Sequence, residues 1–185
     1  SNGRNREVLR IFVEAGAPED IMYEAKPHIG TDVLVLVLQN MRHQIEEWGG
    51  TYQFQSKVTG FLFEQNQVKG VRLSDESIIE TENVILAIGH SARDTFEMLN
   101  AQHFNMEAKS FAVGLRVEHP QSMIQKSQYG DQREDLLPAS YKLAGKGRNQ
   151  RGVYSFCMCP GGYVVDASSE NQRLAINGMS ERARD

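Results

Sequence analysis

The feature that most constrains the fold is residues 83–89 (Asn-Val-Ile-Leu-Ala-Ile-Gly), in which an unbroken apolar run from Val84 to Ile88 ends in glycine. Such a run is typical of a strand that is buried on both faces, as in a parallel sheet. Ligands of open α/β sheets bind outside the carboxyl ends of the strands, and a glycine there lets a ligand approach the backbone without meeting a Cβ atom. Gly89 is therefore a candidate ligand contact, although turn geometry alone also explains a glycine at this place.

A long helix is predicted upstream of this strand. Apolar residues recur along it at steps of three and four, which marks one helix face. They are Leu34, Leu38, Met41, Ile45 and Trp48. Thr31 is the expected N-cap, and Gly49 with Gly50 is expected to end the helix.

Between this helix and the apolar strand the hydrophobic period changes to two, which predicts a β-meander. Its stretches are residues 52–54, 58–63, 68–73 and 78–79. Further helices are predicted at residues 5–15, after Pro18, after Ser91 as N-cap and from Pro120. Further strands are predicted at residues 111–117 and 153–157, with a loop over most of 128–152 and a turn at 160–162. We therefore expect a mixed α/β to α+β fold that combines a helix, a β-meander and one buried parallel strand with further strands and short helices.

The composition narrows the classes of function. There are 20 Lys and Arg against 24 Asp and Glu, a formal net charge of −4, so the bulk composition carries no nucleic-acid footprint. The longest apolar run, residues 33–38, is far shorter than the ~20 residues that cross a bilayer. Two cysteines cannot build a disulfide framework, and no secretory leader opens the sequence. We therefore expect a cytoplasmic protein with no membrane or nucleic-acid partner.

Three segments carry a family resemblance: residues 24–32, 89–96 and 154–163. They resemble a group of uncharacterised FAD-dependent, NAD(FAD)-utilising dehydrogenases. Residues 85–89 are also similar to the Ala-Thr-Gly motif of the glutathione-reductase-like superfamily of two-dinucleotide-binding flavoproteins, with Ile88 in place of the usual Thr. The resemblance extends over about residues 5–185.

This resemblance implies a Gly-x-Gly-x-x-Gly motif that places the FAD pyrophosphate on a helix N-terminus. Residues 145–150 come nearest to it and fail at the last glycine. We therefore expect the motif upstream of residue 1, and interpret the chain as an internal section of a larger flavoprotein that lacks its N-terminal dinucleotide-binding domain. FAD is expected in the intact parent and not on this section alone, with NAD(P)H as a further co-substrate.

The resemblance assigns five consecutive residues to the FAD, near its adenosine half: Ala87, Ile88, Gly89, His90 and Ser91. Val58 follows the strand that presents its backbone to the adenine in the superfamily. A plain core valine explains this residue equally well.

Three residues before the long helix are candidates for substrate chemistry. Lys26, His28 and Thr31 precede or begin a helix N-terminus, a position that can hold an anion or a substrate carbonyl. A neutral histidine can serve as general acid or base near neutral pH, so His28 is a candidate catalytic residue. The alternative is that His28 satisfies loop backbone groups and that Thr31 only caps the helix.

Cys157 and Cys159 are the other candidate catalytic residues. On a strand they would point the same way, and a thiol pair can exchange electrons with a flavin in related enzymes. The redox spacings typical of such enzymes are Cys-x-x-Cys or wider, and a buried cysteine often behaves as a small apolar residue. The two cysteines and five histidines show no zinc-ligand spacing, so no metal is expected.

Arg116 lies on a predicted apolar strand, where a charge needs a partner. It either binds a substrate carboxylate or pairs with Glu118 or another acid. The cations between Lys146 and Arg151 can contact a phosphate, with a solvated loop as the alternative.

The sequence thus predicts three parts: an N-terminal helical segment (1–30), a partial FAD-binding domain with the β-meander (31–91), and part of a substrate and interface domain (92–185). The expected function is that of a section of an FAD-dependent oxidoreductase, linked to NAD(P)H, acting on a small-molecule substrate and inactive in isolation. The alternative is a non-redox flavoprotein module that modifies RNA or serves as a binding scaffold.

Overall fold

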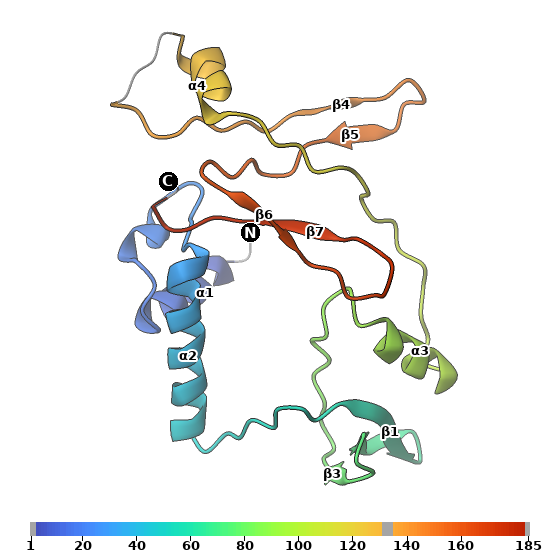
Figure 1. The fold of residues 1–185 in the computed structure, drawn as a ribbon. Helices are drawn as coiled ribbons and strands as arrows, with labels where there is room; N and C mark the ends of the chain where they lie inside the picture. The colour runs from blue at the N-terminus through green and yellow to red at the C-terminus, as the bar shows by residue number, and fades with distance from the viewer. Residues whose placement is uncertain (1–2, 131–134, 184–185) are drawn as a thin grey trace. The chain divides into compact units, whose positions relative to one another are not determined.

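The computed structural model describes residues 3–130 and 135–183. The chain divides into two compact units. The first combines residues 1–50 with residues 115–185, and the second is residues 51–114. Figure 1 shows the elements of both units in chain order. The mixed class of helix and sheet is confirmed, with small antiparallel sheets.

The first unit begins with three helical elements, α1 (Arg4–Glu14), η1 (Glu19–Met22) and α2 (Thr31–Glu47). Helices α1 and α2 were predicted from the apolar spacing, and η1 from Pro18 before it. They bury a small core made of Ala15, Ala17, Ile21 and Val37, against which Leu9, Phe12, Val13, Ile29, Val33 and Met41 pack. Ile21 and Val37 have no exposed surface. The core therefore depends on both helices and on the short helical turn between them.

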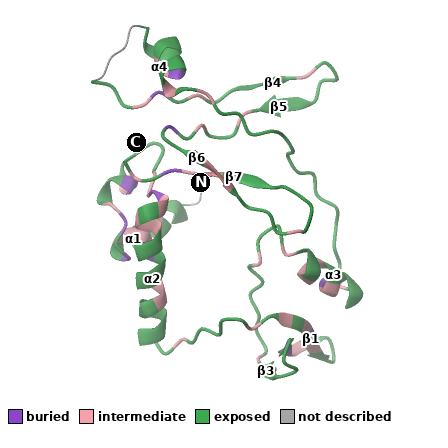
Figure 2. Cartoon of the chain, viewed as in Figure 1, coloured by how far each residue is buried: buried purple, intermediate pink, exposed green. Residues whose placement is uncertain are grey.

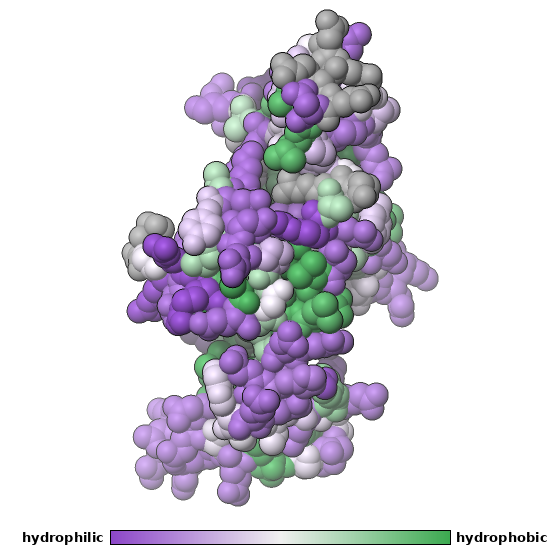
Figure 3. All heavy atoms as spheres, turned by 90° about the vertical axis from the view of Figure 1, so that its left-hand side faces the viewer, coloured by the Kyte–Doolittle hydropathy of each residue, from purple (hydrophilic) through white to green (hydrophobic). Residues whose placement is uncertain are grey.

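The buried face of α2 differs from the predicted one. Val37 is buried, while Leu38 is 56% exposed and Trp48 is 75% exposed. Residues 33–38 are all apolar, so periodicity could not decide which side of the helix meets the core. Apolar side chains of α2 therefore remain on the surface. Figure 2 shows most of α2 in the colour of exposed residues, and Figure 3 shows hydrophobic residues among hydrophilic ones on one face of the molecule.

The rest of the first unit holds α4 (Gln121–Tyr129) and two hairpins. Strands β4 (Ala144–Lys146) and β5 (Gly152–Tyr154) form one antiparallel pair, and β6 (Tyr163–Asp166) and β7 (Ile176–Met179) form the other. The helix from Pro120 was predicted. Strand β4 lies inside the predicted loop, β5 is shorter than predicted, and β6 and β7 were missed.

The turn between β5 and β6 agrees with its prediction. The Gly162 N–H donates to the Cys159 carbonyl at 3.1 Å, and Gly161 has a φ of 65°. That left-handed backbone favours glycine, which explains the Pro-Gly-Gly sequence here.

The second unit is a three-stranded antiparallel meander with one helix. Its strands are β1 (Val58–Glu64), β2 (Gln67–Leu73) and β3 (Ile78–Glu80), and its helix is α3 (Arg93–Ala101). Phe61, Val71, Leu73 and Leu99 form the core. The meander was predicted, but residues 52–54 form no strand.

The end of α3 is fastened to β1 by one side chain. The Gln102 amide donates to the Phe61 carbonyl and accepts from the Phe61 N–H, each at 3.0 Å. This satisfies backbone groups at the edge of the sheet, which would otherwise need water or another strand. Helix α3 begins without a side-chain cap, and its N-cap is Ala92, so the prediction of Ser91 as cap is wrong.

The predicted strands at 83–89 and 111–117 are not formed. Ile85 is 94% exposed and Leu115 is 96% exposed. A buried parallel strand needs a partner on each side, and no described residue pairs with either segment. Among the described residues, no helix combines the length and the apolarity needed to cross a membrane.

Candidate functional site

The first candidate site lies where the N-terminus of α2 meets residues 180–182. Thr31 donates to the Ser180 carbonyl through its N–H at 3.1 Å and through its hydroxyl at 3.2 Å. The Arg182 N–H donates to Asp32 Oδ1 at 2.9 Å. His28 Nε2 lies 3.0 Å from the Glu181 carbonyl, which can only accept, so this nitrogen carries the proton.

The Arg182 side chain closes the same junction. Its guanidinium donates to the His28 carbonyl and forms an ion pair with Asp20. Gly30, between these groups, has a φ of 88° and a ψ of 145°. A Cβ atom at Gly30 would lie 2.7 Å from Arg182 Cα, so the two backbones approach more closely than any other residue would allow.

This arrangement explains the residues before α2 in structural terms. Thr31 is the first helical residue and the cap position is Gly30, so the prediction of Thr31 as N-cap is wrong. His28 bonds a backbone carbonyl, in line with the structural alternative considered for it. Lys26 is exposed. Roles for His28, Lys26 and Thr31 in substrate binding or catalysis remain predictions.

We expect Arg182→Ala to loosen this junction, because the His28 carbonyl and the Asp20 carboxylate then lose their shared donor. The loss should be about 1–3 kcal/mol in free energy of unfolding, the range for hydrogen bonds to charged groups. Hydrogen exchange at residues 28–34 is the measurement. Arg173→Ala is the control, since the Arg173 side chain is 72% exposed and forms its ion pair with Glu170, three residues before it. Equal effects of the two substitutions would contradict this account.

Arg116 contacts strand β7. Its guanidinium donates to Asn177 Oδ1 at 3.4 Å and lies 3.0 Å from where a Gly178 Cβ would be. Among the described residues no carboxylate pairs with it, so the pairing with Glu118 is not formed. Arg116 remains exposed, and its role toward a substrate carboxylate stays a prediction.

Cys157 and Cys159 are both exposed and no disulfide joins them. Strand β5 ends at Tyr154, so neither cysteine lies on the strand that was predicted to orient them. The alternative of a buried, apolar cysteine does not hold for either residue. A redox role for the pair stays a prediction.

The second unit carries the residues that the resemblance assigned to FAD. Val58 begins β1 and packs against the core of the meander. Its neighbour Lys57 forms an ion pair at 2.5 Å with Asp94, in the first turn of α3. Hydrogen bonds from Lys57 and from the Thr95 N–H lower the pKa of Asp94. The start of β1 is therefore tied to the start of the helix that follows residues 87–91.

Residues 87–91 lie mostly on the surface of the second unit. Ala87, Gly89, His90 and Ser91 are exposed, and Ile88 is half-buried. Gly89 has a φ of 70° with no atom within 4 Å of a Cβ placed there. The left-handed backbone thus accounts for the glycine by itself, and the open space above it leaves the segment accessible to a ligand.

Comparison with known proteins points to one class. Residues 110–185 match the family described as FAD-dependent protein, C-terminal domain-like. An uncharacterized protein of Clostridium beijerinckii (strain ATCC 51743 / NCIMB 8052) is 46% identical over 181 residues. That alignment covers 96% of this chain and 34% of the relative, so the chain spans about a third of the relative's length. The glutathione-reductase-like superfamily stays a prediction.

The part that matches the FAD-dependent family contains Arg116, Cys157, Cys159 and the 180–182 segment. The residues expected to contact FAD, Val58 and 87–91, lie outside it. The match therefore supports an FAD-dependent protein without testing any assigned residue.

One polar pair in the matched part was missed from the sequence. His119 Nε2 lies 2.9 Å from the Tyr141 hydroxyl, and the two rings are 5.6 Å apart. The pair lies beside α4, where Gln121 donates to the Ala139 carbonyl at 2.8 Å. Twenty-two residues separate His119 from Tyr141, and no periodicity links them, so only the fold could bring them together.

Proposed function

We propose that this chain is a section of an FAD-dependent oxidoreductase. The observation that supports this most strongly is the match of residues 110–185 to FAD-dependent proteins. The FAD would supply the acceptor or donor for a hydride or electron pair. The residues of this chain would bind and orient the cofactor and a small-molecule substrate, with NAD(P)H as the second substrate.

The segment 87–91 fits a contact to the adenosine half of FAD. Its apolar neighbour Ile85 is exposed, which suits a flat heterocycle, and His90 and Ser91 offer polar groups beside it. Gly89 has no Cβ atom, and the space where one would lie is open, so a ligand can approach its backbone. The proposal assigns binding to this segment and leaves the redox chemistry to the cofactor.

Substrate handling is proposed for the first unit. Arg116 is exposed, and its hydrogen-bond partner among the described residues is a neutral amide, so its charge is available to a carboxylate. The thiols of Cys157 and Cys159 are exposed and accessible to a redox partner. His28 would act there only through its second ring nitrogen, because Nε2 is occupied by the Glu181 carbonyl.

The test is the flavin content of the full-length protein that contains this chain. We expect Ala87→Glu to raise the Kd for FAD about tenfold or more, because an unpaired carboxylate facing the cofactor costs at least about 1.4 kcal/mol. Ala101→Glu is the control, since Ala101 is an exposed alanine of the same unit and receives the same charge.

Three results would count against this proposal. Absence of flavin from the full-length protein refutes it outright. Equal flavin affinity in the two variants removes residues 87–91 from the cofactor site. Failure of both NADH and NADPH to bleach bound flavin without oxygen would favour the non-redox flavoprotein alternative.

A further inference from the structure

The β4–β5 hairpin presents an ordered set of side chains on one face. Its register pairs Ala144 with Tyr154 and Lys146 with Gly152. Side chains alternate between the two faces of a strand, so Lys146 and Tyr154 lie on the same face. Each stands opposite a small residue, Gly152 or Ala144, so neither is crowded from the neighbouring strand.

The ladder continues by one further pair. The Ser155 N–H donates to the Leu143 carbonyl at 2.9 Å, and the Leu143 N–H donates to Ser155 Oγ at 2.8 Å. The next residues outward, Lys142 and Phe156, flank this pair and are both exposed. The hairpin and the residues that flank it thus carry two lysines and two aromatic rings.

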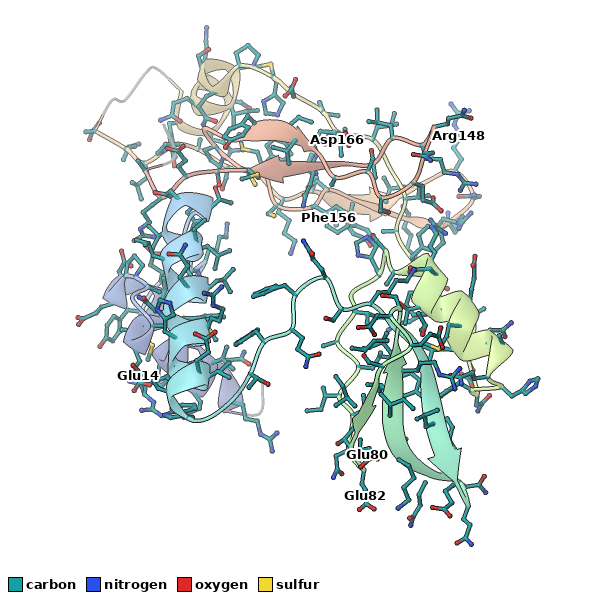
Figure 4. The ribbon with its side chains drawn as sticks, turned by 60° about the horizontal axis from the view of Figure 1, so that its bottom comes forward. Glu14, Glu80, Glu82, Arg148, Phe156 and Asp166 are labelled. Atoms are coloured by element: carbon teal, nitrogen blue, oxygen red, sulfur yellow. The ribbon has the colours of Figure 1, made fainter. Side chains whose placement is uncertain are left out.

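The aromatic rings are in contact and open to solvent. Tyr154 and Phe156 meet edge to face, with centroids 5.7 Å apart and an interplanar angle of 86°. Tyr154 is 54% exposed and Phe156 is 69% exposed. Figure 4 shows Phe156 and, at the hairpin, Arg148 among the side chains drawn as sticks. Exposed aromatic rings on a sheet face are the surfaces on which nucleotide bases stack.

The charge around this face is strongly one-sided. Residues 136–165 contain four cations and no carboxylate, so the remaining 16 cations and 24 carboxylates leave the rest of the chain at −8. The cations are Lys142, Lys146, Arg148 and Arg151. None of them forms an ion pair with any residue that the structure describes. Their charge is therefore available to an anionic ligand.

We propose that these four residues, named here the hairpin platform (Lys142, Lys146, Tyr154 and Phe156), bind a nicotinamide dinucleotide. The rings stack on its bases and the ammonium groups hold its phosphates. Two rings with a few cations match one dinucleotide, while the negative charge of the rest of the chain disfavours a long polyanion. The inference rests on the proposed function, because it names the second substrate of that flavoprotein.

The test uses the full-length protein with NAD⁺ and NADP⁺, which bind without reducing a flavin. Isothermal titration calorimetry at low salt should show that Lys142→Ala with Lys146→Ala raises the Kd about tenfold, since charge-assisted hydrogen bonds to phosphate are lost. Tyr154→Leu with Phe156→Leu should also raise the Kd, because stacking is lost while apolar bulk remains. Flavin content should stay unchanged in both variants.

Lys109→Ala with Lys126→Ala is the matched control, because both lysines are exposed and the same charge is removed. The proposal is overturned if the platform variants bind the dinucleotides with the same Kd as the unsubstituted protein. It is also overturned if the control variant raises the Kd equally. Loss of flavin would instead assign the platform to FAD, and tighter binding of a single-stranded oligonucleotide than of either dinucleotide would assign it to nucleic acid. If the protein contains flavin and the platform variants leave the Kd for the dinucleotides unchanged, the platform is refuted and the proposed function still stands.

Discussion

Replacing Gly30 by alanine should destabilise the first unit by about 2–4 kcal/mol, through backbone strain and overpacking together. The φ of 88° and ψ of 145° at Gly30 lie near a region that is essentially restricted to glycine. The new Cβ would also meet the Arg182 backbone, 2.7 Å from its Cα. Urea denaturation gives the free energy of unfolding, and peptide-resolved hydrogen exchange locates the loss.

Gly49→Ala separates the two contributions. Gly49 has a φ of 86° and belongs to the same unit, but no atom lies within 4 Å of a Cβ placed there. Its replacement should therefore cost only the left-handed strain, about 1–2 kcal/mol. We expect faster exchange at residues 28–34 and 180–182 for Gly30→Ala alone. Equal losses at the two glycines would show that the close approach of residues 180–182 is not formed.

Leu99→Ala should cost about 2–5 kcal/mol in the second unit, the range for removing a buried leucine side chain. Leu99 is 5% exposed and shares its core with Phe61, Val71 and Leu73. The cavity would separate α3 from the sheet, so the backbone bonds of Phe61 with the Gln102 side chain should open as well. Hydrogen exchange of β1 and α3 is the measurement.

Leu86→Ala is the control for this effect, because Leu86 belongs to the same unit and is 47% exposed. Its loss should change the free energy of unfolding by less than about 0.5 kcal/mol, as for surface substitutions in general. A large effect at Leu86 would mean that residues 83–89 are covered in the full-length protein. In that case the exposed run forms the buried strand that its composition predicts.

The local elements were predicted well where a single periodicity was present. The β-meander follows from its period of two, apart from residues 52–54, which form no strand. Helices α1, α2 and α4 follow from apolar spacing and from glycine and proline at their ends. The face of α2 could not be predicted, because residues 33–38 are all apolar. Only tertiary packing with Ala15, Ala17 and Ile21 buries Val37.

The candidate sites likewise divide into features that are visible in the sequence and contacts that only the fold creates. The glycine at position 89 and the cations between Lys146 and Arg151 are visible in the sequence. The pairs His119–Tyr141 and Arg116–Asn177 join residues 22 and 61 positions apart, and no local pattern encodes such distances. The hairpin platform needed the strand register, because a shift by one residue would move every side chain to the other face.

The sequence by itself determined the local elements, since hydrophobic period, glycine and proline act over a few residues. Through its resemblance it also pointed to the flavoprotein class that the match of residues 110–185 supports. The tertiary structure decided what long-range contacts control. It joined residues 180–182 to the start of α2 and placed Lys146 and Tyr154 on one face of the β4–β5 hairpin. It also left residues 83–89 without a strand partner among the residues that the structure describes. The physical reason is that a buried strand, a helix face or a binding surface is defined by its partner, and the partner lies far away in the chain.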